Sequence, residues 1–140
     1  MAVASGKPLG RETSPGVVWR QGWIVTNEQA FKTMARHMLA QGKRSVAVAR
    51  DSFGVEHESC RYRGPDGLKC AVGVLIPDEE YRESLEGLSA ENIPGNVPSL
   101  EGIDRWVLRS AQYIHDHLPV DEWRHRLEKE CVSRGWAVDF

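Results

Sequence analysis

The chain has 140 residues, of which 41% are hydrophobic and 27% are charged, and its formal net charge is -2. This composition is typical of one folded domain and argues against intrinsic disorder. No apolar run approaches the roughly 20 residues that a membrane-spanning helix needs, so the sequence argues against an integral membrane protein.

The beginning of the chain differs from the rest. Residues 1–16 are rich in Gly, Pro and Ser and lack the apolar centre of a signal peptide. We therefore expect residues 1–24 to form a flexible extension, residues 25–140 to form a single globular domain, and the protein to be cytoplasmic. Its three cysteines are then expected to be reduced.

The charge is distributed unevenly. Residues 1–70 carry 11 Lys and Arg and 6 Asp and Glu, whereas residues 71–140 carry 7 and 14. A basic front half and an acidic back half favour encounters with charged partners, but they do not identify one.

The first predicted helix begins after Thr26. The sequence Thr26-Asn27-Glu28-Gln29 has the pattern of a capping box, and Gly42 is a typical C-terminal stop. The apolar residues between them fall at helical spacing on one face. These residues are Phe31, Met34, Ala35, Met38 and Leu39.

A small β element is predicted next. Residues 45–50, SVAVAR, alternate as a short strand does. Residues 61–63 and 68–70 flank the turn sequence Gly64-Pro65-Asp66-Gly67, which predicts a hairpin. The apolar run 70–76 is expected to form a short buried helical turn that ends at Pro77.

Three further helices are expected in the second half of the chain. One starts near Pro77, one follows a long apolar stripe from Leu100 to Leu118, and one starts near Asp121. Trp106 and Trp123 are expected in the core. The predicted fold class is therefore α+β, mainly helical with four to five helices, with a small β-hairpin inserted after the first helix.

Three motifs together resemble a known family. Residues 60–76 read C-x-Y-R-x-x-x-G-x-x-C-A-x-G-x-L-I, residues 78–87 contain an acidic-Tyr segment ending in Glu-Gly, and residues 112–116 read Q-x-I-H-D, with Trp123 following. Over about residues 25–135 the chain resembles a family of small proteins encoded by bacteriophages, prophages and their bacterial hosts. The resemblance implies a phage-type accessory protein in a bacterial cytoplasm. It implies no activity, because none is settled for the family.

Cys60 and Cys70 allow three interpretations. A hairpin could bring them close enough for a disulfide, which a reducing cytoplasm disfavours. Nine residues separate them, unlike the closely spaced pairs of zinc sites, so no metal is predicted. If a metal were held, its ligands would be Cys60, Cys70 and His115. The third interpretation is that both thiols only pack in the core.

Cys70 is also a candidate nucleophile for a hydrolase or transferase. His115 would be its base and Asp116 would orient the imidazole. Neighbouring residues on a helix point about 100° apart, however, so Asp116 is not expected to orient His115 directly. The alternative is that His115 or Asp116 closes the C-terminal end of its helix.

The predicted binding residues lie around the hairpin and at the edges of elements. Basic and aromatic side chains together suit a nucleic acid, and edge tryptophans suit a protein interface. The acidic residues beside the hairpin dilute the first interpretation. The residues are Arg61, Tyr62, Arg63, Lys69, Trp23 and Trp136.

No P-loop, G-x-G-x-x-G, H-E-x-x-H or G-x-S-x-G motif is present in the sequence. We therefore expect an accessory protein that binds a host or defence macromolecule, with a protein as its partner and no cofactor. Counter-defence inhibition, such as blocking a CRISPR effector, is one form of this function. The alternatives are the Cys70/His115 enzyme and a nucleic-acid-binding protein that uses the basic hairpin.

Overall fold

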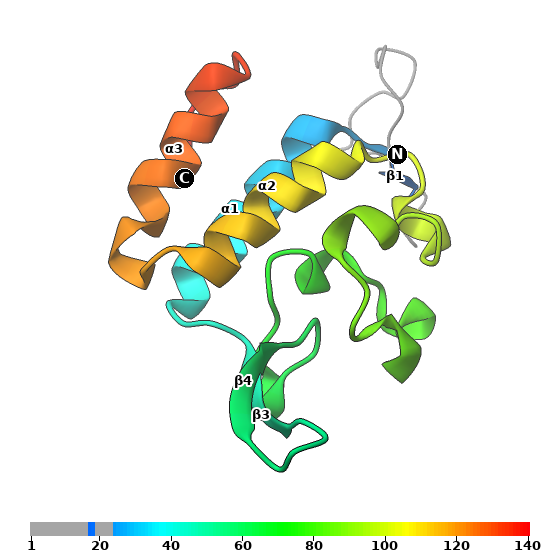
Figure 1. Ribbon diagram of the computed structural model, residues 1–140. Helices are drawn as coiled ribbons and strands as arrows, with labels where there is room; N and C mark the ends of the chain where they lie inside the picture. The colour runs from blue at the N-terminus through cyan, green and yellow to red at the C-terminus, as the bar shows by residue number, and fades with distance from the viewer. Residues whose placement is uncertain (1–16, 19–23) are drawn as a thin grey trace.

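Three α-helices form the centre of the computed structural model, which describes residues 17–18 and 24–140 (Figure 1). They are α1 (Asn27–Gln41), α2 (Arg105–His117) and α3 (Trp123–Ser133), and each contacts the other two. This part of the chain therefore has three α-helices and not the predicted four to five, although the α+β class is confirmed. None of its helices has the length and apolarity to cross a membrane.

Helix α1 has the predicted boundaries. The Thr26 hydroxyl accepts the backbone N–H of Gln29, and the Gln29 side chain accepts the Thr26 N–H, so the capping box is complete. Gly42 follows the helix in the left-handed conformation with φ 70°. The predicted apolar face is buried against α2 and α3, apart from the partly buried Leu39.

The hairpin after α1 pairs β3 (Val46–Arg50) with β4 (Glu56–Cys60) in antiparallel register. The predicted strand 45–50 is thus confirmed, but its partner is a segment for which no strand was predicted. The expected hairpin of residues 61–70 is reduced to one bridge between Arg63 and Lys69. Residues 56–59 of β4 are all exposed, so the strand sequence EHESC has no alternation of apolar and polar residues. A search for apolar periodicity therefore could not identify this strand.

Residues 61–104 form a series of short 3-10 turns and loops that cover one side of the helices (Figure 1). The helix predicted from Pro77 is replaced by two such turns, Asp78–Glu80 and Glu83–Leu85. Arg82 between them is extended, with φ -149° and ψ 155°. The expected turn after Cys70 is present as the 3-10 turn Gly73–Leu75.

Helix α2 starts later than its apolar stripe. Leu100 and Ile103 are buried in the preceding loop, and Asp104 caps the helix by accepting the Trp106 N–H. Trp123 is fully buried as predicted, but Trp106 is 55% exposed, so its expected core position is wrong. Trp106 directly precedes the core residue Val107, which points about 100° away around the helix.

The extension 1–24 lies mostly outside the described residues, and Trp23 lies outside them entirely. Strand β1 (Val17–Val18) of the extension pairs antiparallel with β2 (Ile24–Val25), which spans its boundary with the domain just before α1 begins.

Candidate functional site

A pocket of about 530 Å³ opens between three segments that are distant in sequence. The base of β4, the loop 87–91 and the C-terminal half of α2 form its walls, so the fold creates it only when the hairpin packs on α2. Cys60, Gln112 and Asp116 are among its lining residues. The others are Ser59, Tyr62, Gly87, Leu88, Ser89, Ala90, Glu91, Arg109, Tyr113 and His117.

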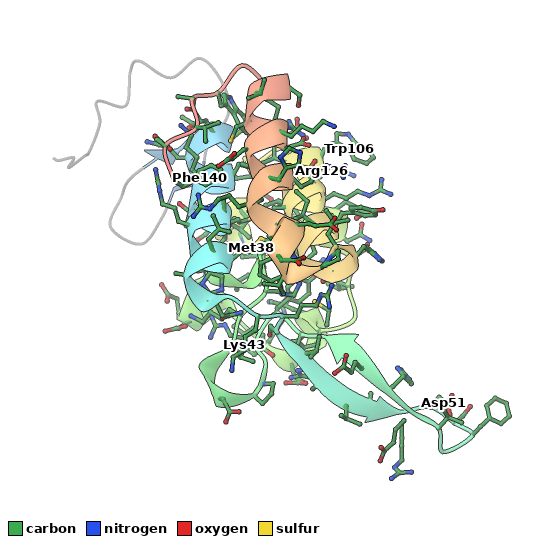
Figure 2. The ribbon with its side chains drawn as sticks, turned by 90° about the vertical axis from the view of Figure 1, so that its left-hand side faces the viewer. Met38, Lys43, Asp51, Trp106, Arg126 and Phe140 are labelled. Atoms are coloured by element: carbon green, nitrogen blue, oxygen red, sulfur yellow. The ribbon has the colours of Figure 1, made fainter. Side chains whose placement is uncertain are left out.

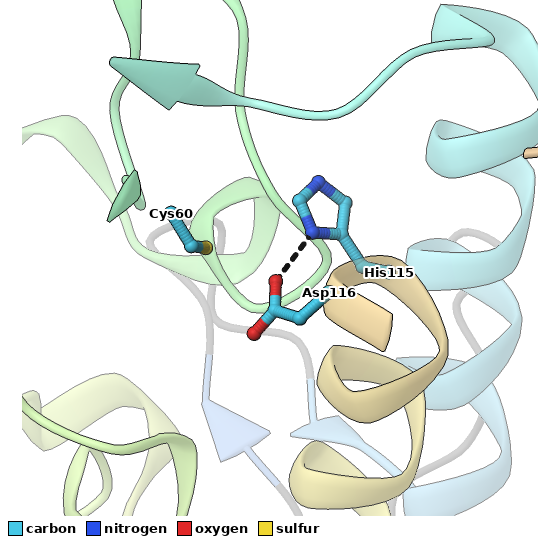
Figure 3. A group of neighbouring side chains, drawn as sticks. All are labelled: Cys60, His115 and Asp116. Carbon is cyan, nitrogen blue, oxygen red and sulfur yellow. Dashed lines mark hydrogen bonds and ion pairs between the residues drawn. The ribbon is translucent and has the colours of Figure 1, made fainter. Parts of the chain in front are cut away.

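Cys60, His115 and Asp116 form a compact cluster at this pocket (Figure 3). One nitrogen, sulfur or oxygen atom from each lies within 4.8 Å of those of the other two. His115 is 1% exposed and lies behind the other two, which are partly exposed. The cluster therefore joins the last residue of β4 to the end of α2.

Both ring nitrogens of His115 are engaged in hydrogen bonds. The backbone N–H of Ser45 donates to Nε2 at 3.1 Å, and Nδ1 lies 2.7 Å from Oδ1 of Asp116 (Figure 3 shows the second contact). A backbone N–H can only donate, so Nε2 must present its lone pair and the ring proton belongs on Nδ1. The imidazole is thereby held in one tautomer, with Nδ1–H donating to the carboxylate.

Asp116 is the acceptor at the centre of the cluster. The Gln112 amide donates to Oδ1 of Asp116 at 2.9 Å and to Sγ of Cys60 at 3.3 Å, while its own oxygen accepts the Val72 N–H. Burial raises the pKa of Asp116, but the hydrogen bonds from His115, Cys60 and Gln112 outweigh it and hold the pKa below its usual value. The carboxylate is therefore ionised at neutral pH.

Cys60 is a poor nucleophile in this setting. Its interaction with the Cys70 thiol and its burial raise the pKa of Cys60 well above the ordinary value, and His115 lowers it by less. The thiol stays protonated at neutral pH and the reactive thiolate is scarce. Cys70 itself is fully buried, and the described cysteines are free thiols.

The titration of His115 is governed by opposing effects. Burial lowers the pKa of His115, whereas its hydrogen bond to Asp116 and the nearby Cys60 thiol raise it, and the net result is a pKa above the ordinary value. The Ser45 N–H acts against that balance, because Nε2 must lose this bond before it can accept a proton.

The donor set of the cluster resembles that of a metal site, but the hydrogen bonds do not fit one. A metal on Nδ1 would displace the ring proton to Nε2, where it would face the Ser45 N–H. Metal-bound histidines normally donate their second N–H to an acceptor, which is the opposite arrangement. The ligand set expected for a metal also differs from the observed cluster, in which Asp116 takes the place of Cys70.

The predicted catalytic residues are only partly brought together. Asp116 does orient His115, so the expectation that neighbouring positions prevent this contact is wrong. Although the two residues point in different directions from the helix, their side chains are long enough for the carboxylate of Asp116 to reach the ring of His115. With Nε2 held by Ser45 and Nδ1–H donated to Asp116, however, His115 has no free nitrogen to take a proton from a thiol.

The predicted binding residues are largely engaged within the protein. Arg61 pairs with Glu83 at 2.9 Å, and Arg63 pairs with Asp78 at 2.9 Å and donates to the Ile76 carbonyl. Tyr62 is buried and its hydroxyl donates to the Leu88 carbonyl, while the Lys69 backbone bonds the Gln41 amide. Trp136 packs against Phe31 with ring centroids 5.7 Å apart. These residues therefore do not form one open basic patch.

Three residues in and around the cluster were not among the predicted site residues. Gln112 lies four residues before Asp116, a spacing that places both on one helix face and was a usable signal. Ser45 is 70 residues away from His115, and no local pattern connects them. Arg44 closes the end of α2 by donating to the carbonyls of His115 and Leu118, where a cation suits the helix dipole.

Comparisons with protein-family models, with curated proteins and with solved structures found no match. The resemblance to phage-encoded proteins therefore stays a prediction. The function has to be argued from the geometry.

Proposed function

We propose that the protein acts by binding another protein and that the β3–β4 hairpin is the part that enters the partner. One observation carries the proposal: Phe53, in the turn between the strands, is 89% exposed. Burying a phenyl ring is among the larger favourable contributions to an interface, so an aromatic residue at an exposed turn suits an anchor.

The hairpin extends away from the helices. Figure 2 shows it projecting from the body, with Asp51 at the outer end. Residues 50–59 are all exposed, and Val48 and Val55 add apolar surface next to Phe53. The hairpin therefore offers side chains that the fold of the protein itself does not use.

The turn is nevertheless ordered by its own hydrogen bonds. The Asp51 carboxylate accepts the backbone N–H groups of Phe53 and Val55 at 2.9 and 3.0 Å. Arg50 pairs with Glu56 across the strands at 2.7 Å. A preorganised loop loses less conformational entropy on binding, which favours a recognition role.

A protein suits this element better than a nucleic acid or a small substrate. Exposed apolar side chains (Val48, Phe53 and Val55) lie beside the acidic Asp51 and Glu56 near the tip. Strands β3 and β4 form a sheet of only two, so each has an unpaired edge. Apolar anchors and free strand edges are features that protein partners recognise. The engaged ring nitrogens of His115 also argue against turnover at the adjacent cluster.

The test places a photo-crosslinking amino acid at position 53 of the full chain, in a lysate of bacterial cells. We expect a discrete protein adduct that excess unlabelled wild-type protein suppresses. A competitor with Phe53→Ser and Val55→Ser should suppress it at least tenfold less well, because it lacks the apolar anchor.

The matched control carries the same crosslinker at Val132, which is 70% exposed on α3, on the helical body. It should not give this adduct. Identical adducts from both positions, or equal competition by the double variant, would contradict the proposal.

A further inference from the structure

The outer side of α2 carries a row of exposed aromatic and cationic residues. Trp106, Arg109, Tyr113 and His117 follow each other at intervals of three and four, so they share one helix face. All four are exposed, with Trp106 at 55% and Tyr113 at 50%. We call these four residues, together with the exposed Arg126 of α3, the α2 outer face.

Hollows lie on both sides of this row. The pocket at the Cys60 cluster is lined by Arg109, Tyr113 and His117, and a second hollow of about 300 Å³ is lined by Trp106, Arg109, Tyr113 and Arg126. Arg109 and Tyr113 line both, so they form the ridge between them. Figure 2 shows Trp106 and Arg126 on the same side of the molecule.

The cations of this face lack carboxylate partners within the described residues. The Arg109 guanidinium lies 5.3 Å from the Trp106 ring centroid, and neither Arg109 nor Arg126 forms an ion pair there. Two acidic neighbours, Glu130 and Asp104, are already engaged, whereas Glu91, which lines the first hollow with Arg109, forms no ion pair within the described residues. Glu130 pairs with Arg134 at 2.9 Å, and Asp104 accepts the Trp106 N–H. Two guanidinium groups therefore remain available for anionic groups of a ligand.

We infer that the α2 outer face binds single-stranded nucleic acid, which goes beyond the protein-binding role of the hairpin. Bases stack on Trp106 and Tyr113, and Arg109 and Arg126 hold phosphates. Trp106 and Tyr113 are seven residues apart, or about 10 Å along the helix, which matches about three nucleotides at about 3.4 Å each. Exposed rings alternating with unpaired arginines suit bases and phosphates better than they suit an acidic peptide, which has few flat groups to stack.

The experiment measures the fluorescence anisotropy of labelled 12-nucleotide oligothymidylate and oligoadenylate with the full chain, from low to physiological salt. Both strands should bind, because stacking accepts every base. A plot of the logarithm of the binding constant against the logarithm of the salt concentration should have a slope of about -1.4. Each of the two phosphate contacts contributes about -0.7 to this slope on a single strand.

Four variants and one control separate stacking from charge. Trp106→Ala should weaken binding about tenfold, and Trp106→Phe should restore most of it, because a phenyl ring still stacks. Arg109→Gln and Arg126→Gln should each reduce the salt slope by about 0.7. Lys129→Gln, at an exposed cation of α3 that lines neither hollow, is the control and should leave the slope unchanged.

The inference is overturned by any of three results. The first is no binding to either strand at low salt. The second is binding that Trp106→Ala leaves intact while its thermal melt is unchanged. The third is displacement by polyglutamate as efficient as by oligothymidylate, which would mean that the face recognises acidic polypeptides by charge.

Discussion

The backbone N–H of Ser45 donates to Nε2 of His115 across 70 residues of sequence, at 3.1 Å. This one bond assigns the ring proton to Nδ1 and directs it at Asp116. It also joins the start of the hairpin to the end of α2. The donor set of the cluster suits catalysis or metal binding, but its hydrogen bonds instead connect the hairpin to α2.

The tautomer of His115 can be observed directly. In ¹⁵N-labelled protein at mildly alkaline pH, where the imidazole is neutral, we expect His115 to show a protonated Nδ1 and an unprotonated Nε2, the reverse of the tautomer usually favoured by free histidine. Long-range ¹H–¹⁵N correlation spectra of the imidazole distinguish these forms. His57, which is exposed on β4, serves as the internal comparison. A proton on Nε2 of His115 would contradict the assignment.

Zinc should not stabilise the protein. Binding at Nδ1 would place Nε2–H against the Ser45 N–H, so the cluster has to give up hydrogen bonds to accept a metal. We expect the melting temperature to be unchanged by stoichiometric Zn²⁺ or by a chelator, and metal analysis of protein purified without a tag to show no zinc. A rise in melting temperature with Zn²⁺ that Cys60→Ser abolishes would overturn this prediction.

The thiols should react slowly at neutral pH. The raised pKa of Cys60 leaves little thiolate, and Cys70 and Cys131 are fully buried. Mass spectrometry after iodoacetamide treatment from pH 5 to 9 should show slow labelling at all three positions, with no slowing in His115→Ala. Fast labelling of Cys70 near neutral pH that His115→Ala suppresses would favour the hydrolase or transferase instead.

Asp116→Asn should destabilise the protein in a pH-dependent manner. The pKa of Asp116 is lowered on folding, so its contribution is present above the unfolded pKa, near 3.8, and is lost as pH falls through the folded value. At pH 7 we expect the free energy of unfolding to drop by about 1–3 kcal/mol. Urea titrations should show this difference shrinking below about pH 4. Asp121→Asn, at an exposed position, should change stability by less than about 0.5 kcal/mol at either pH.

Gly73 should not tolerate even alanine. A Cβ atom there would lie 2.1 Å from the Tyr62 carbonyl oxygen, and a backbone atom cannot move aside as a flexible side chain can. We expect Gly73→Ala to cost about 3 kcal/mol or to prevent folding, as judged by circular dichroism and urea titration. Gly95→Ala is the control, because its nearest atom lies at 3.9 Å. Equal stability of the two variants would disprove the close approach.

Local features of the sequence predicted local structure well. The capping box at Thr26, the stop at Gly42 and the strand after it depend on residues that are neighbours in the chain. The apolar stripes of α1 and α2 were equally readable, because helical spacing alone places their residues on one face. These patterns sufficed for the α+β class and for the position of the hairpin after the first helix.

The sequence by itself therefore determined the three α-helices, the caps of α1 and much of the core of this protein. Only the tertiary structure decided that β4 pairs with β3, that residues 77–88 form turns in which Glu86 binds the backbone N–H groups of Tyr62 and Arg63, and that Trp106 faces solvent. It also decided that Ser45 and Asp116 hold His115 from opposite sides. The physical reason is range: capping and periodicity act over a few residues, whereas these bonds join segments whose approach depends on how the whole chain packs.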